Sequence, residues 1–230
     1  MTDIYEIDFN SFLLREIFNV CLISALILFA AFLFFKMREK EPGSAQRKIY
    51  LGYCLFLLSY ACTRVFFVFS DIEVYSTESA GTLLNTVYVG IAYSFGIFGA
   101  LWLILMLERF LLHTRYIFTV IGIIMLILSL LSIFIMALNA VIQFAITITL
   151  PAFFLLVVLL YLYITVKSAG EARKRSLGII IGLVIMMVGF LFGSSVIGAY
   201  LDPIGLYVAR ILIEPFIVIA GSAVFTFSQR

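Results

Sequence analysis

Seven apolar runs of about 20 residues dominate the sequence. They cover residues 12–35, 49–70, 82–107, 116–138, 143–166, 177–200 and 206–227. A helix of about 20 residues crosses a hydrocarbon core of roughly 30 Å, and in lipid a helix satisfies its own backbone hydrogen bonds. The runs therefore predict an all-α integral membrane protein, in which residues 1–230 form a single seven-transmembrane helix bundle.

The composition agrees with a lipid environment. Of 230 residues, 64% are hydrophobic and 12% are charged, whereas soluble globular domains carry roughly 25% charged residues. The basic residues lie in short connections between apolar runs, so no basic domain exists and we expect no nucleic-acid partner. The first residues carry Asp3, Glu6 and Asp8 where a cleavable signal sequence would be basic, so we expect no such signal.

The charges between the runs predict the orientation of the bundle. One set of connections, 36–48, 109–115 and 167–175, is rich in Lys and Arg. The alternate set, which includes 71–81 and Asp202, contains acidic residues and no Lys or Arg. Because basic connections stay in the cytoplasm, we expect a multi-pass protein of the cell membrane, embedded in the lipid bilayer, with its N-terminus outside and its C-terminus inside.

Three ionisable residues inside the runs form the core of a candidate binding site. Arg64 lies six residues from the outer end of its run, and Arg210 and Glu214 lie four and eight residues from the outer end of theirs. At 1.5 Å per residue the three depths are roughly 9, 6 and 12 Å. A charge at membrane depth is costly and turns toward the bundle interior, so these side chains are expected to meet in one outer layer.

Polar neighbours extend this layer into a cup that opens outward. Tyr60 shares a helix face with Arg64, and Asn85 and Tyr88 lie near the outer end of the third run. The cup has three interpretations: a binding site for an anionic small molecule, an ion-pair network that only fixes helix register, or an ion pathway. The last is disfavoured because the charges do not continue through the inner half of the runs. Pro215, directly after Glu214, predicts a kink beside the buried carboxylate.

Glycines at helical spacing predict a close packing face on the sixth run. Gly178, Gly182, Gly189 and Gly193 lie on one side of that helix. Small residues allow helices to approach closely in membranes. We expect this face to pack within one bundle, with a homo-oligomer interface as the alternative.

No group of residues points to catalysis or to a bound cofactor. The apolar runs contain no acidic pair and no nucleophile beside a base, and the last run lacks the lysine on which retinal proteins form a Schiff base. We therefore expect no enzyme, no catalytic or metal-binding residue and no cofactor.

The segment 161–193 resembles the N-terminal seven-helix sensory regions of prokaryotic histidine kinases and related archaeal membrane proteins. It combines an aromatic helix end, the polar residues Lys167, Glu171 and Arg173, and a glycine-spaced helix. The resemblance implies a sensory fold that acts on a cytoplasmic partner. In such proteins a kinase follows the seventh helix, and no kinase is expected after Arg230 here.

The leading functional hypothesis is a receptor-like sensor. It would bind a small anionic or amphiphilic ligand in the outer cup and signal to a cytoplasmic partner. The expected ligand-binding residues are Arg64, Arg210, Glu214, Tyr60, Asn85 and Tyr88. A small-solute transporter or channel that uses the same residues, and a structural subunit of a membrane complex, are the alternatives.

Overall fold

Every regular element in the described part of the chain is a helix. The computed structural model describes residues 9–79, 82–109, 115–135, 155–193 and 207–229, with residues 132 and 207–211 described by their backbone alone. The helices are α1 (Phe9–Arg38), α2 (Ala45–Thr77), α3 (Leu83–Leu107), α4 (Ile117–Phe134), the stretch Leu155–Lys167, α6 (Gly170–Gly193) and α8 (Tyr207–Phe227). This confirms the predicted all-α class.

Four of these helices, α1, α2, α3 and α6, are long and apolar enough to cross a membrane. Shorter apolar stretches occupy residues 117–131, 155–167 and 212–227. Large apolar side chains face outward, with Phe35 63%, Leu28 69% and Phe134 80% exposed. An apolar outer surface of this kind is unfavourable in water, and in a membrane protein lipid shields it from water.

The predicted boundary after the second run is wrong. We expected a connection to begin at Asp71, but α2 continues to Thr77 and ends where Glu78 adopts a left-handed conformation with φ 52°. Phe12 of α1 stacks on Tyr75 with ring centroids 4.1 Å apart. This contact stabilises the additional helical turns at the end of α2. A helix of 33 residues is roughly 50 Å long, which exceeds the roughly 30 Å thickness of a hydrocarbon core.

The predicted start of the sixth run is also wrong. We expected it at residue 177, but α6 begins at Gly170 with φ +60°. Arg173, Lys174 and Arg175 therefore project from the first turns of a helix instead of a loop. The boundary between the fourth and fifth runs lies outside the described residues.

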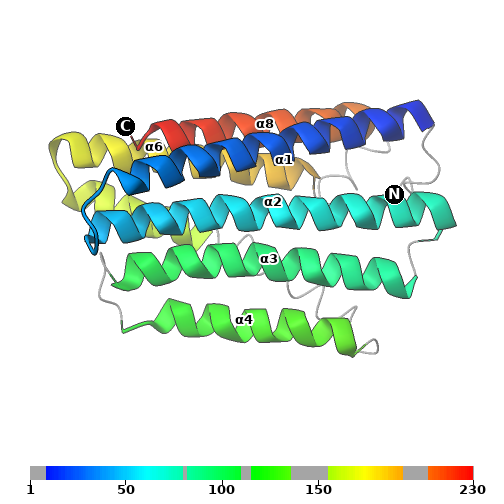
Figure 1. Cartoon of the computed structure of the whole chain (residues 1–230), viewed down its shortest axis with the longest axis horizontal. Coiled ribbons are helices and arrows are strands. Elements are labelled where there is room, and N and C mark those ends of the chain that lie inside the picture. Colours follow the sequence, from blue (N-terminus) through cyan, green and yellow to red (C-terminus); the bar gives the residue numbers. More distant parts are fainter. Residues whose placement is uncertain (1–8, 80–81, 110–114, 136–154, 194–206, 230) are drawn as a thin grey trace.

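The first four helices lie side by side in chain order, and α8 packs beside α1 with α6 behind it (Figure 1). Helix α2 lies between α1 and α3 and contacts both. Its Tyr53 ring also packs on Phe225 of α8, with ring centroids 5.2 Å apart. One end of the bundle gathers the end of α1, the starts of α2, α4 and α6, and the end of α8 (Figure 1). We call it the basic end, because the Lys and Arg residues of 36–48 and 167–175 lie there.

The glycine face of α6 packs against α8 within the same chain. A Cβ added at Gly182 would lie 2.5 Å from the backbone nitrogen of Phe225, and one added at Gly221 of α8 would lie 2.6 Å from the backbone nitrogen of Met186. Since the two backbones touch, no larger residue fits at these positions. The described seam is thus an intramolecular one.

Glu108 connects α3 to α4 at the basic end. Its carboxylate accepts hydrogen bonds from the backbone nitrogens of Phe118, at 3.1 Å, and Thr119, at 2.9 Å, and from the Thr119 hydroxyl. The side chain is buried and satisfies amides that the first turn of α4 leaves without partners. This acidic residue therefore has a structural role as a helix cap.

Candidate functional site

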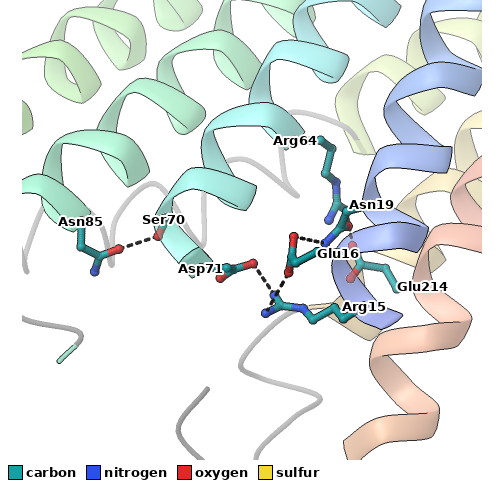
Figure 2. A network of polar contacts seen from close by, with 8 residues as sticks. All are labelled: Arg15, Glu16, Asn19, Arg64, Ser70, Asp71, Asn85 and Glu214. Atoms are coloured by element: carbon teal, nitrogen blue, oxygen red, sulfur yellow. Dashed lines mark hydrogen bonds and ion pairs between the residues drawn. The ribbon is translucent and has the colours of Figure 1, made fainter. Parts of the chain in front are cut away.

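Eight polar side chains from four helices lie together near the end of the bundle opposite the basic end (Figure 2). We call this group the polar layer. Helix α1 contributes the first three, α2 the next three, and α3 and α8 one each: Arg15, Glu16, Asn19, Arg64, Ser70, Asp71, Asn85 and Glu214.

Arg64 joins α2 to α8 through an ion pair with Glu214. The guanidinium Nη2 donates to Glu214 Oε1, and the two side chains are only 11% and 9% exposed. Nε and Nη2 also donate to the hydroxyl oxygen of Tyr60 at 2.9 and 2.8 Å. A buried ion pair becomes favourable only when further hydrogen bonds satisfy its remaining groups, and Tyr60 supplies two of them.

Aromatic rings surround the Arg64 guanidinium. Its Cζ lies 5.3 Å from the centroid of the Tyr60 ring and 5.7 Å from that of Phe190 on α6, within the range of a cation–π contact. The two rings pack together with centroids 4.6 Å apart. Arg64 therefore ties three helices together: α2, α6 and α8.

A second ion pair joins α1 to α2. Arg15 Nη2 lies 2.7 Å from Asp71 Oδ2, and Arg15 Nη1 lies 3.7 Å from Glu16 Oε1. Asn19 donates from Nδ2 to Glu16 Oε2 at 3.3 Å. Figure 2 shows Glu16 between Arg15 and Asn19, so this half of the polar layer is also linked through side chains.

The structure brings three of the predicted site residues together and separates two others. Tyr60, Arg64 and Glu214 are in contact, as described above. Asn85 instead accepts a hydrogen bond from Ser70, and the ring of Tyr88 packs on Phe69 of α2 with centroids 5.8 Å apart. These two α3 residues fasten α3 to α2. The backbone of Arg210 belongs to α8, but its side chain lies outside the described residues.

Glu214 lies directly before a proline in α8 and is crowded by α6. Pro215 lies inside α8, and a proline removes one hydrogen bond from the helix ladder. A Cβ added at Gly193 of α6 would collide with the Glu214 carboxylate. Glycine at position 193 is therefore what lets this carboxylate reach Arg64.

The described part of the polar layer holds more carboxylates than Glu214 alone. A cup built on Arg64, Arg210 and Glu214 would be positive, but the described layer holds two guanidiniums and three carboxylates. With all five groups ionised, the described layer carries one excess negative charge. The Arg210 side chain lies outside the described residues and is not counted, so the predicted positive charge of the cup stays a prediction.

Arg15 and Asp71 were missed as site residues. Arg15 falls inside the first apolar run, and its position there was the signal that could have identified it. Asp71 was assigned to a connection because the apolar run ends at Ser70. Their ion pair exists because α2 remains helical through that region.

Neither a metal site among the described residues nor a related protein points to a function for this chain. Within the described ranges no group of three or more His, Cys, Asp or Glu side chains could hold a metal ion. No family model, curated protein or solved structure matches this chain. Function is therefore inferred from the geometry of these side chains.

Proposed function

We propose that this chain is a seven-helix sensor of the cell membrane that binds a small amphiphilic acid at Arg64. Binding shifts α8, and the movement is passed to a cytoplasmic partner. The observation that carries the proposal is the buried ion pair between Arg64 of α2 and Glu214 of α8, directly beside Pro215.

Arg64 has the donors that an anionic ligand needs. A guanidinium carries five N–H groups in a rigid fork that suits a carboxylate. Its Nε and Nη2 are engaged with Tyr60 and Glu214, whereas Nη1 donates no hydrogen bond to any residue that the structure describes. A ligand carboxylate can therefore bind at Nη1 and compete with Glu214 for Nη2.

We expect the ligand to bind together with one proton. The described layer already has one excess carboxylate, so a further anion at Arg64 would repel Glu214. Like charges that share a site cannot both stay ionised at low cost, and one proton shared by the two carboxylates removes the repulsion. The ligand that fits is a weak acid whose binding is coupled to uptake of one proton.

The surroundings of Glu214 favour an amphiphile over a fully polar anion. Ile213 and Phe216 flank it and are 45% and 54% exposed on the apolar outer face of α8. Phe18 of α1 packs on Phe216 with ring centroids 4.9 Å apart. A ligand with its carboxylate at Arg64 can lay an alkyl chain against these rings.

The packing of α8 offers a route for the signal. Release of Glu214 frees the part of α8 around Pro215 from α2, and the rest of α8 touches α6 through the close seam at Gly182 and Gly221. Since α6 leads to the basic end, a shift of α8 reaches Arg173 and Lys174 there. With the basic end in the cytoplasm, those exposed residues are available to a signalling partner.

The interior between the two ends favours a sensor over a transporter. Leu22, Leu57, Ile97 and Leu183 are fully buried in this core. Among the described residues of 17–35, 49–63, 83–107, 178–193 and 215–227, none is Asp, Glu, Lys, Arg or His. A polar solute would find no charged group along this path, so we expect no flux of carboxylates through the protein in sealed vesicles.

A thermal-unfolding experiment tests the binding site. The protein is reconstituted in phosphatidylcholine nanodiscs and heated with decanoate or with decanol, which has the same chain without the carboxylate. A ligand at 100 times its Kd stabilises by roughly 2.7 kcal/mol, which raises the Tm by roughly 5–10 °C for a chain of this size. We expect decanoate to produce such a shift and decanol to produce none.

Two arginine variants make the test specific. Arg64→Gln removes the proposed binding group, and Arg15→Gln is the matched control because it removes a guanidinium from the same layer. The decanoate-induced shift should disappear in Arg64→Gln and persist in Arg15→Gln, each measured against its own ligand-free Tm. Equal stabilisation by decanol, or an unchanged decanoate shift in Arg64→Gln, would refute the proposal.

A further inference from the structure

A cavity at the basic end is separate from the polar layer. Its volume is about 390 Å³, which is within the range of small-ligand sites. It lies where α1 ends, α2 and α6 begin, and the chain leaves α8. None of the eight polar-layer residues lines it.

The charged groups that line this cavity are mostly cationic. Lys36 comes from the last turn of α1, Lys40 follows that helix, Arg175 comes from α6, and Glu39 is the one carboxylate among the described lining residues. Three cations and one anion leave a charge of +2. Such a cavity attracts an anion that carries more than a single carboxylate's charge or accepts several hydrogen bonds.

The walls of the cavity are held by contacts within the protein. Tyr50 donates its hydroxyl to the backbone oxygen of Gln229 at 2.7 Å. Lys40 Nζ lies 5.9 Å from the centroid of the Tyr50 ring. Lys36 Nζ lies 2.8 Å from Glu39 Oε2. The lysines are thus positioned before any ligand arrives, which lowers the entropic cost of binding.

Arg175 supplies the recognition group that these contacts leave available. It is exposed on the second turn of α6 and forms no ion pair with another described residue. A guanidinium fork binds two oxygens of a phosphate at once, and lysines add point charges. The combination of one available arginine with two positioned lysines suits a phosphate group better than a carboxylate.

We propose that this cavity binds a phosphate group at the membrane surface. Phe35 precedes Lys36 and is 63% exposed on the apolar face of α1, so a headgroup in the cavity can keep its acyl chains against the helix. Basic pockets between helices on the cytoplasmic side are suited to anionic lipid headgroups. A soluble phosphate ester has the same binding chemistry, and the experiment separates the two sources.

Native mass spectrometry in a non-ionic detergent provides the test. Dioleoylphosphatidylglycerol is titrated against the wild-type protein, with dioleoylphosphatidylcholine as the reference lipid. The test variant Lys40→Gln/Arg175→Gln is compared with Arg173→Gln/Lys174→Gln, which removes the same two residue types from exposed positions outside the cavity. Each charge-assisted hydrogen bond contributes enough that we expect about a tenfold or larger loss of affinity in the test variant.

A third variant gives an effect of opposite sign. Glu39→Gln removes the one carboxylate among the described lining residues and should strengthen phosphatidylglycerol binding, whereas Glu171→Gln, outside the cavity, should leave it unchanged. The same loss in both double variants would mean that only diffuse surface charge attracts the lipid. That result, or binding that is insensitive to Lys40 and Arg175, would overturn the proposal.

Competition identifies the source of the phosphate. Glycerol 3-phosphate and inorganic phosphate are added to the protein–phosphatidylglycerol complex at millimolar concentration. Displacement that depends on Arg175 indicates a soluble phosphate compound, and no displacement indicates the lipid headgroup. Arg64→Gln should leave all of these affinities unchanged, so the outcome is independent of the function proposed for the polar layer.

Discussion

The two ends of the bundle use charge in different ways. In the polar layer the side chains of Arg64 and Glu214 are 11% and 9% exposed and pair with each other. At the basic end Glu171 and Lys174 also form an ion pair, at 3.2 Å, but their side chains are 73% and 78% exposed. The first pair joins two helices, whereas the second lies within one helix.

This difference in burial decides what each pair contributes. Removing one partner of a buried pair leaves an uncompensated charge and costs about 3–5 kcal/mol, while exposed pairs contribute roughly 0–1 kcal/mol. Charges in the polar layer therefore hold helices together, and under the proposed function a ligand would replace one partner. The exposed charges of this pair at the basic end should therefore be removable without loss of the fold.

The largest expected effect comes from breaking the Arg64–Glu214 pair. Arg64→Leu and Glu214→Leu should each lower the free energy of unfolding by about 3–5 kcal/mol. The double variant should lose less than the sum, with a coupling energy within about 0.5–3 kcal/mol. Reversible unfolding of the four proteins in mixed micelles measures this cycle. If Arg64→Leu is as stable as wild type, the ion pair does not hold α8.

Breaking the Arg15–Asp71 pair should give the second largest loss in the free energy of unfolding. Its side chains are 19% and 17% exposed, so water screens it slightly more than the first pair. Arg15→Gln should cost roughly 1.5–3 kcal/mol, as expected for a hydrogen bond to a charged group. The same unfolding assay applies, with Asp71→Asn as the partner variant. Strict additivity of the two substitutions would show that the residues do not interact.

Increased crowding around Glu214 should lower the free energy of unfolding by a smaller amount, and only while the Glu214 carboxylate is present. Gly193→Ala forces the carboxylate away from its position and should cost about 1–3 kcal/mol, as overpacked sites do. Gly96→Ala is the matched control, because its added Cβ would lie 3.5 Å from the Thr63 hydroxyl, an ordinary contact. The Gly193→Ala penalty should shrink in a Glu214→Ala background. A penalty that persists there would assign the crowding to another neighbour.

The smallest effect is expected at the basic end. Lys174→Gln breaks the exposed pair with Glu171 and should change the free energy of unfolding by less than about 0.5 kcal/mol. The measurement is the same unfolding curve. A loss comparable to that of Arg64→Leu would show that burial does not explain the contrast between the two ends.

Much of the fold follows from apolar length alone. Each described helix overlaps one predicted run, because a stretch such as 12–35 can satisfy its backbone in lipid only as a helix. The errors lie at the ends, where polar residues continue a helix. The composition of segment 71–77 is typical of a connection, yet the segment is helical and its Tyr75 stacks on Phe12.

The candidate site was predictable in part. Arg64 and Glu214 were found because a charge inside an apolar run is rare and needs a partner, and their pairing follows from similar depth. The placement of Asn85 beside Ser70 could not be foreseen, because helix rotation is set by packing, and the sequence gives depth but not rotation. The cavity at the basic end needed four chain segments in their folded positions.

Calorimetric titration of decanoate tests the proposed sensor most directly. The titration is done at pH 7.5 in buffers with different ionisation enthalpies, so that the difference in heat counts the protons taken up. The coupled mechanism predicts about one proton per decanoate in the wild-type protein and almost none in Glu214→Gln, which keeps Arg64. Binding without proton uptake, or uptake that is unchanged in Glu214→Gln, would contradict it.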